Sequence, residues 1–215
     1  AMAPSAPLRL AATCTAPPPL RPNLAFVRTP VWDQAEPDLQ DGFAELADAL
    51  GGVDAVDLPK PFEQAHAMHG AIMLADIARN FGRYHDNGRD RLSARLAAMI
   101  EEGRRVLAVD YALAHDWIDV LNAVLDEILT RYDAILTPAT TGEAPTGLES
   151  TGSPAFCTIW TYCGVPAITL PLLTGGNGMP IGVQLIGARG NDARLLRTAR
   201  WLVESLKDGS PDEPA

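Results

Sequence analysis

The sequence predicts an α/β fold in which helices cover both faces of a mixed β-sheet. A short β-prone run, Leu24–Val27, is followed by a helical repeat of apolar residues and then by a second β-prone run, Val53–Leu58. Two strongly apolar runs, Val165–Leu170 and Ile181–Ile186, lie close together near the end of the sequence and predict a hairpin. With 215 residues, of which 47% are hydrophobic and 20% charged, the chain is long enough to bury a core around these elements.

The first two strands flank a predicted helix. Leu39, Phe43 and Leu46 recur at helical spacing, and Asp38 is available as the N-cap. Gly51-Gly52 supplies the stop. Because a helix separates the two strands, we expect them to pair in parallel after a crossover.

The middle of the chain, from residue 61 to about residue 131, has the apolar periodicity of helices. Breaks are expected near Phe81-Gly82 and near Asn87-Gly88. A third strand, Ala134–Thr137, stops at Pro138. Residues 139–154 follow as a loop that is rich in Thr, Gly, Ser and Pro, and long loops of this kind are often functional or disordered.

The predicted hairpin turns through residues 174–178. Its two strands are almost continuously apolar, so we expect both of their faces to be covered. The glycines of this turn are not a phosphate-binding loop, because no Lys-Ser/Thr pair and no helix follow them. Asn191 or Asp192 can cap a final helix. Its apolar stripe consists of Leu195, Leu196, Ala199, Leu202, Val203 and Leu206.

These elements suggest one folding domain. We expect a flexible N-terminal arm over residues 1–22, a single α/β domain over residues 23–207 and a flexible tail over residues 208–215.

Charge and cysteine content narrow the classes of function. The formal charge of −10 argues against nucleic-acid and membrane-surface partners. The three cysteines, Cys14, Cys157 and Cys163, form no C-x-x-C pair, so neither a disulfide framework nor a zinc knuckle is indicated. No apolar run is long enough to span a bilayer. A cytoplasmic location fits these features best.

The segment from Pro154 to Leu202 carries the most specific motifs. Gly164-Val165-Pro166-Ala167-Ile168 precedes Met179-Pro180-Ile181-Gly182-Val183-Gln184-Leu185-Ile186-Gly187, and Asp192-x-x-Leu195-Leu196 comes next. In this order the motifs closely resemble the end of the amidase-signature family. The stretches Leu24 to Trp32 and Tyr132-Asp133-x-x-Leu136-Thr137-Pro138 resemble earlier parts of the same half, so the resemblance covers about residues 22–206.

The resemblance implies the C-terminal half of the amidase-signature fold and the hydrolysis of linear amide C–N bonds. The family uses a nucleophilic serine, a second serine in a cis peptide arrangement and a lysine base, and none of these aligns here. Only two lysines, Lys60 and Lys207, are present, and none of the six serines is adjacent to another. Losing a hydrolase nucleophile costs about 10⁶ in turnover, or about 8 kcal/mol of barrier. We therefore expect a truncated pseudoenzyme without catalytic residues of its own.

Two other readings stay open for the function. The chain could be a non-catalytic binding or structural protein, or one partner of a split amidase that a complementary N-terminal half completes in trans. A half-domain exposes apolar surface, so we also expect it to form a homodimer, or another homo-oligomer, through the surface that the missing half would cover. A small amide would be its substrate only after completion.

The best candidates for substrate binding are Thr158, Trp160 and Thr161. In the family, the stretch that leads into the Gly-x-Pro turn borders the acyl side of the substrate. If residues 156–163 form a helix, Thr158 and Thr161 share one side of it, and Trp160 could form an apolar wall. Ordinary core packing explains these residues equally well.

Weaker signals elsewhere have structural explanations. Ser153 lies between Gly152 and Pro154 rather than in a nucleophile elbow, so it is expected to be an ordinary loop residue. His66 and His69, with Glu63 one turn earlier, could place three ligands on one helical face, but no fourth ligand is evident, so we expect no metal and no cofactor. Cys157 and Cys163 have no basic neighbour in sequence and are expected to be buried and unreactive.

Overall fold

The computed structural model describes residues 14–18 and 20–207, which divide into two compact units. Unit 1 comprises the residues up to Leu58 and those from Leu125 onward, and unit 2 comprises Pro59–Val124. Residues 1–13 and 19 of the expected arm, and the whole expected tail, lie outside the described residues. The expectation of a single folding domain over residues 23–207 stays a prediction.

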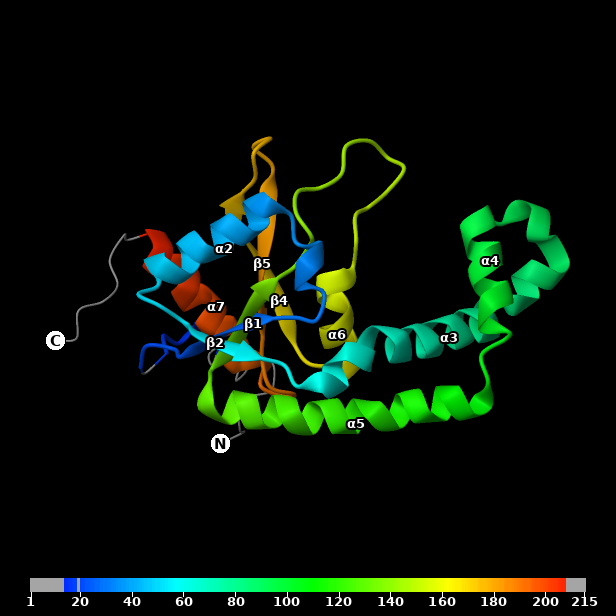
Figure 1. Cartoon of the computed structure of the whole chain (residues 1–215), viewed down its shortest axis with the longest axis horizontal. Helices are drawn as coiled ribbons and strands as arrows, with labels where there is room; N and C mark the ends of the chain where they lie inside the picture. Colours follow the sequence, from blue (N-terminus) through cyan, green and yellow to red (C-terminus); the bar gives the residue numbers. More distant parts are fainter. Residues whose placement is uncertain (1–13, 19, 208–215) are drawn as a thin grey trace, which may run out of the picture. The chain divides into compact units, whose positions relative to one another are not determined.

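Unit 1 is built on a five-stranded mixed sheet in the order β2-β1-β3-β5-β4 (Figure 1). Its strands are β1 (Leu24–Arg28), β2 (Asp54–Asp57), β3 (Ala134–Pro138), β4 (Ala167–Thr174) and β5 (Pro180–Ile186). β1 pairs in parallel with β2 and β3, whereas β5 runs antiparallel to β3 and β4. The predicted α/β class, the parallel first pair and the final hairpin are confirmed.

Helices α2 (Pro37–Ala49) and α7 (Asp192–Lys207) cover one face of this sheet. Side chains from both helices form one buried cluster with alternate residues of the strands. An aromatic group closes the cluster near the end of β1, where the Phe26 ring stacks on Phe43 at 5.6 Å and meets Trp32 edge-on at 5.5 Å. Trp32 belongs to a short 3₁₀ helix, η1 (Trp32–Gln34), that was not predicted.

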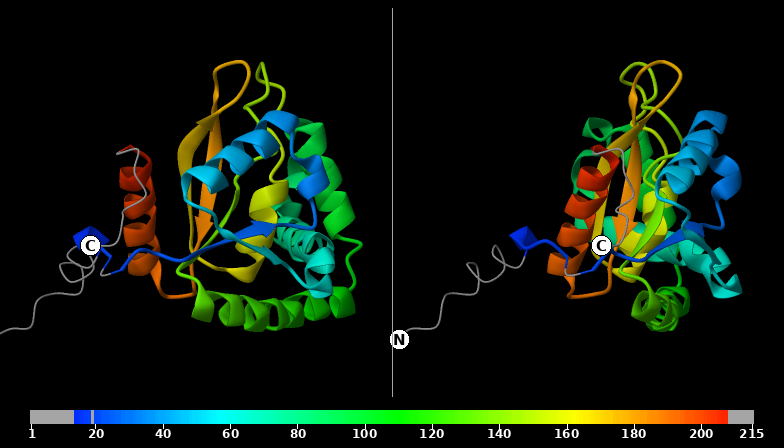
Figure 2. Two further views of the ribbon diagram at one scale, coloured as in Figure 1. Left: turned by 60° about the vertical axis from the view of Figure 1, so that its left-hand side comes forward. Right: turned by 90° about the vertical axis from the view of Figure 1, so that its left-hand side faces the viewer.

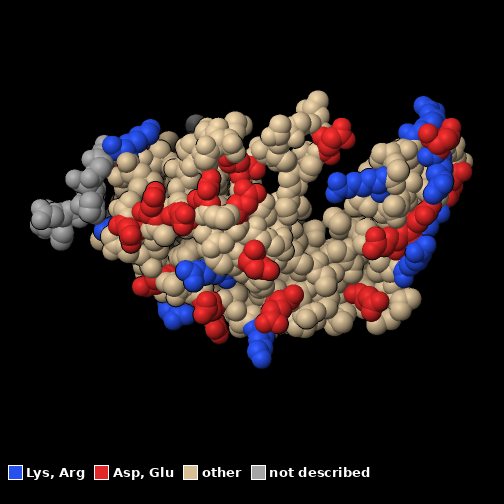
Figure 3. Space-filling model, turned by 45° about the horizontal axis from the view of Figure 1, so that its top comes forward, with Lys and Arg blue, Asp and Glu red and all other residues tan. Residues whose placement is uncertain are grey.

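The start of α2 differs from the prediction. Its N-cap is Glu36 rather than Asp38, because Pro37 occupies the first helical position, where its missing N–H is not needed. The helix ends at Ala49, with Leu50 as its C-cap, directly before the expected stop at Gly51 and Gly52, whose φ angles of 71° and 90° are readily adopted only by glycine. The outer side of α2 carries exposed acidic residues, which gather around this helix in Figure 3.

The opposite face of the sheet is covered by α6 (Ala155–Cys163). Ala25, Val27 and Ile135 on this face are fully buried. The Cys157 side chain of α6 lies 3.8 Å from the Gln184 amide on β5, which fixes the side on which the helix packs.

The prediction that both hairpin strands are covered on both faces is correct for β5 and wrong for β4. Nearly all of β5 is buried, because β5 lies between β3 and β4. β4 is an edge strand whose residues alternate between exposed and half-buried, with Ala167, Thr169 and Pro171 exposed. Pro171 also falls where the register with β5 shifts, between Leu170 and Leu173.

The loop 139–154 and the β4–β5 turn extend side by side beyond the sheet, as Figure 2 shows from two directions. The final helix α7 follows the hairpin, and the Asn191 carbonyl accepts hydrogen bonds from the N–H groups of Arg194 and Leu195. Its predicted apolar stripe is correct at Leu195, Ala199 and Leu202, whereas Leu196 is 40% exposed and points away from the core.

Unit 2 is helical, as predicted. It contains η2 (Lys60–Gln64), α3 (Ala65–Gly88), η3 (Arg89–Arg91) and α4 (Ala94–Gly103), and α5 (Ala108–Arg131) continues from it into unit 1. The expected break near Gly88 is confirmed, but α3 continues through Phe81-Gly82. Gly82 is buried, and its carbonyl accepts a hydrogen bond from Arg104 at 3.3 Å, so this glycine serves close packing rather than a helix end.

Candidate functional site

The helix α6 carries the three residues that the sequence singled out. It ends at Gly164, whose left-handed φ of 65° turns the chain toward β4. The N–H groups of Gly164 and Val165 donate to the carbonyls of Thr161 and Trp160, at 3.2 and 3.3 Å. This turn fixes where the helix lies relative to the edge strand.

Thr158, Trp160 and Thr161 occupy different environments. The Thr158 hydroxyl donates to the Pro154 carbonyl at 2.9 Å within the helix, and Thr161 is exposed one turn later. Trp160 is only 1% exposed, so its ring is enclosed in the interior. Its indole N–H is buried without a hydrogen-bond partner among the described residues. The expected role of these three residues in substrate binding stays a prediction.

A buried polar group lies beneath α6. Thr137 on β3 is directly opposite Gln184 on β5, and the Thr137 hydroxyl donates to the Val27 carbonyl at 3.2 Å. The Gln184 amide nitrogen contacts the Cys157 sulfur, and the Cys157 thiol donates to the Ala139 carbonyl at 3.1 Å. Gln184 Oε1 is buried and, within the described part of the chain, has no donor.

This polar group lies toward the carboxyl ends of β1 and β3, which point to the same end of the sheet because the two strands are parallel. Binding sites in α/β sheets commonly lie at this end. This group could not be recognised in the sequence, because its members come from three separate segments. The only local signal was a glutamine inside the otherwise apolar run of β5.

The exposed face of β4 lies beside this buried polar group. Thr169 is the exposed strand neighbour of Gln184, and Ala167 and Pro171 flank it on the same side. Together with the exposed Thr161 of α6, these residues form what we call the α6–β4 surface, which is the candidate functional site. It offers the hydroxyl groups of Thr161 and Thr169 rather than charge, which suits a neutral polar substrate group such as an amide.

The thiols near this surface are not activated. Burial raises the pKa of Cys163 to about 12 and also raises the pKa of Cys157. Burial, with a contribution from Cys163, raises the pKa of Tyr162 to about 12. Burial thus disfavours the reactive thiolate form of both cysteines. Cys163 is buried as expected, whereas Cys157 is only half-buried, and the low reactivity of the two thiols stays a prediction.

The loop 139–154 is anchored by Glu143. Its carboxylate accepts hydrogen bonds from the side-chain amide of Asn177 at 2.7 Å and from the backbone N–H groups of Asn177 and Met179 at 3.1 and 3.0 Å. The bond from the Asn177 side chain, helped by the two backbone bonds, lowers the pKa of Glu143. This carboxylate ties the loop to the hairpin turn.

Three serines of the described chain, Ser93, Ser150 and Ser153, accept hydrogen bonds from nearby backbone N–H groups. Ser93 accepts from the Leu96 N–H as the N-cap of α4, and Ser153 accepts from the Ala155 N–H before α6. Ser150 accepts from the Gly152 N–H in the loop. The Ser153 hydroxyl thus makes a local contact with the backbone two residues on, which suits the ordinary loop residue that was expected, and Pro154 rather than Ser153 is the N-cap of α6.

Metal-binding groups and membrane-spanning helices can be assessed within residues 14–18 and 20–207. No group of three or more His, Cys, Asp or Glu side chains is placed to hold a metal ion in this range. Burial, and then the neighbouring His66, lower the pKa of His69. No helix in the same range has the length and apolar character needed to cross a bilayer.

Comparison with known proteins gives consistent matches. A family model described as Amidase matches residues 11–196. One component of the glutamyl-tRNA(Gln) amidotransferase of Halothermothrix orenii is 26% identical over 193 residues, covering 75% of this chain and 40% of that protein. A Mycobacterium tuberculosis protein named as the amidase AmiC is 29% identical over 215 residues, covering 89% of this chain and 45% of that protein.

Solved structures agree with these sequence matches at the level of the fold. The crystal structure of an amidase superposes with a TM-score of 0.74 at 21% identity, covering 88% of this chain and 47% of that chain. A 6-aminohexanoate cyclic dimer hydrolase complexed with substrate gives a TM-score of 0.74 at 23% identity, covering 95% and 49%. The chain thus spans less than half the length of each of these relatives.

Proposed function

Since the chain belongs to the amidase family, we propose that it is the C-terminal portion of an amidase that hydrolyses amide C–N bonds. It supplies one wall of the substrate site through the α6–β4 surface, and the rest of the enzyme supplies the serines, the lysine base and the oxyanion hole. One observation carries this proposal: the family model matches most of the chain, yet the chain covers less than half of its relatives.

The environment of the serines supports the proposal that the chain alone is inactive. A nucleophilic serine needs a general base within hydrogen-bond reach and an exposed hydroxyl. The Ser93 and Ser153 hydroxyls instead accept backbone N–H groups at the starts of helices, at 3.2 and 3.3 Å. The thiols of Cys157 and Cys163 offer no substitute, because burial raises the pKa of each.

The open side of β4 supports a covering partner. β4 is eight residues long, mostly apolar and at the edge of the sheet, with exposed residues along one face. Natural proteins rarely leave such an edge unprotected, because its free backbone groups recruit other strands. We propose that the complementary part of an amidase covers this edge and completes the site against Thr161 and Thr169.

A second candidate is a non-catalytic binding or structural protein that forms a homodimer. The same β4 edge favours this candidate, because two copies could pair there without a complement. Light scattering at micromolar concentration separates the cases. A monomer would exclude the homodimer, and a stable dimer without amidase activity would favour it. We also propose a cytoplasmic location, since Cys14, Cys157 and Cys163 form no disulfide within the described chain.

The upstream coding DNA tests the proposed function directly. We expect an in-frame lysine codon, followed by a Gly/Ser-rich stretch with two serines, ahead of the codon for Met2. The extended protein should hydrolyse simple amides, and the chain alone should fall below it by about 10⁶. An upstream frame that is closed by stop codons would instead leave the chain as a partner-dependent or structural protein.

A further inference from the structure

A cavity lies at the end of the unit 1 sheet where β1 and β3 begin. It has a volume of about 580 Å³ and opens beside the first turns of α7. The polar residues that line it come from three segments and are Arg21, Asn23, Asp133, Asn191, Arg194, Arg197 and Thr198. Because the carboxyl ends of β1 and β3 lie at the opposite end, this cavity is separate from the α6–β4 surface.

The one carboxylate among these residues is already engaged. Arg194 Nε donates to Asp133 Oδ1 at 2.7 Å, and the backbone N–H of Asn23 donates to Asp133 Oδ2 at 2.7 Å. Asp133 therefore neutralises Arg194 and holds the chain at the start of β1. Each of its two oxygens thus already has a donor.

Arg197 is the lining cation that this arrangement leaves uncompensated. Its Nε–H group is enclosed and has no acceptor among the described residues. Enclosing a charged donor without a partner costs more than leaving a neutral one unpaired, which is itself about 1–3 kcal/mol. Arg194 lies in the first turn of α7 together with Asp192, where the helix dipole favours anions, and Arg197 lies in the second turn.

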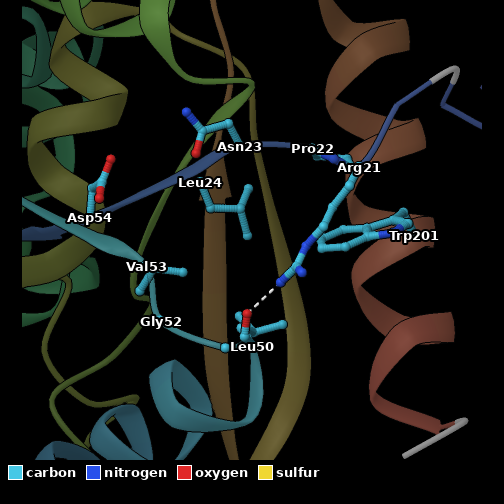
Figure 4. Close-up of a pocket in the computed structure, with 10 residues that line it drawn as sticks. Arg21, Pro22, Asn23, Leu24, Leu50, Gly52, Val53, Asp54 and Trp201 are labelled. Atoms are coloured by element: carbon cyan, nitrogen blue, oxygen red, sulfur yellow. Dashed lines mark hydrogen bonds between the residues drawn. The ribbon is translucent and has the colours of Figure 1, made fainter. Parts of the chain in front are cut away.

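Arg21 adds charge at the wall of the cavity without filling it. Figure 4 shows its side chain passing the Trp201 ring and reaching the Leu50 carbonyl in a neighbouring cavity of about 300 Å³. The Arg21 guanidinium lies 5.9 Å from the centre of that ring. Its hydrogen bond closes the end of α2. Because a guanidinium has donors only, Arg21 adds positive charge at the wall and no acceptor for Arg197.

We propose that this cavity binds a small oxyanion of the phosphate type, with Arg197 as its principal donor. The fork of a guanidinium matches two oxygens of such a group, and the amide of Asn191 and the hydroxyl of Thr198 are further donors. The anion opposes the charge of the Arg197 guanidinium and the positive end of α7. This site does not depend on the proposed amidase function, since it involves none of the α6–β4 residues.

Thermal unfolding of the full chain in inorganic phosphate, with chloride replaced at constant ionic strength, tests the site. We expect the unfolding midpoint to rise with phosphate concentration and to saturate. Calorimetric titration should show one phosphate per chain. Arg197→Gln should weaken binding at least tenfold, whereas the matched control Arg200→Gln on the same helix should leave it unchanged, because Arg200 pairs with Glu204 instead. Parallel titrations with acetate separate phosphate recognition from general oxyanion binding.

A second readout keeps the test decisive if Arg197→Gln alters folding. Without phosphate, Arg197→Gln should be at least as stable as the original chain, because it removes an enclosed donor that lacks an acceptor. The proposal is overturned if phosphate and chloride give the same midpoint, if the effect never saturates, or if Arg197→Gln and Arg200→Gln lose phosphate binding equally. Equal binding of acetate overturns the phosphate assignment.

Discussion

The contact between α3 and α4 in unit 2 depends on Gly103. A Cβ added there would lie 1.9 Å from the Leu74 carbonyl oxygen and 2.9 Å from the Ala78 Cβ. The nearest obstacle is backbone, so no side-chain rotation can relieve it. Gly103→Ala therefore forces the two helices apart.

The structure sets the size of the effect. Restoring ordinary contact requires the 1.9 Å separation to grow to about 3.4 Å, so the backbones must shift by about 1.5 Å. Overpacking of this kind costs about 1–3 kcal/mol, and the intrinsic gain of alanine over glycine in a helix offsets at most about 1 kcal/mol. A net loss of stability is expected, lowering the thermal midpoint by several degrees.

Gly70 provides the matched control, because it also lies in a helix of unit 2 and a Cβ there would meet nothing within 4 Å. Urea unfolding followed by circular dichroism at 222 nm should give a lower midpoint for Gly103→Ala and a higher one for Gly70→Ala. If both variants are stabilised alike, helix propensity alone governs these positions and the close α3–α4 contact is refuted.

Three further outcomes concern unit 1. Glu143→Gln should loosen the β4–β5 turn at neutral pH. The pKa of Glu143 is lowered in the folded chain, so its stabilising effect is present above the ordinary glutamate pKa and is lost as the pH falls through the folded value. In acid, the urea midpoint of the original chain should therefore converge with that of Glu143→Gln. Equal midpoints at every pH would contradict the anchor; Glu149→Gln, in the same loop, is the control. Cys163 should resist iodoacetamide at pH 7.5 until urea unfolds the chain, because burial raises its pKa to about 12. Intact mass measures the labelling, and rapid labelling of Cys163 in the native chain would show that it is accessible. Trp160→Phe should change the unfolding free energy by less than about 1 kcal/mol, since it removes an unpaired buried N–H, whereas Trp160→Ala should cost about 3–5 kcal/mol; a large loss in the phenylalanine variant would reveal a hydrogen bond to the indole.

The sequence predicted the elements of the fold because their signals are local. Leu39, Phe43 and Leu46 specify the inner face of α2 by spacing alone, and all three are buried as expected. Gly82 misled the prediction because a glycine that ends a helix and one that admits a neighbouring chain look alike in sequence. Asp38 was the better capping residue by type, but α2 begins at Pro37, so Glu36 is the N-cap.

The candidate site was less predictable because it depends on which strands become neighbours. The apolar run of β4 is the same whether the strand is central or at an edge, and only the strand order exposes Thr169. Thr137 and Gln184 lie far apart in sequence and become neighbours only through the β3–β5 register. The helix that carries Thr158 and Thr161 was predictable, but the enclosed Trp160 N–H was not.

Labelling with a serine-directed fluorophosphonate decides whether the chain is an amidase portion without a reactive serine of its own. The purified chain is incubated with the probe and its intact mass is measured, with an active amidase of the same family as the positive control. We expect an unchanged mass, because no described serine is shown beside a general base and Ser93, Ser150 and Ser153 accept backbone N–H groups. Stoichiometric addition of one probe to the folded chain would instead reveal a catalytic serine within it and refute the proposed dependence on a complementary half.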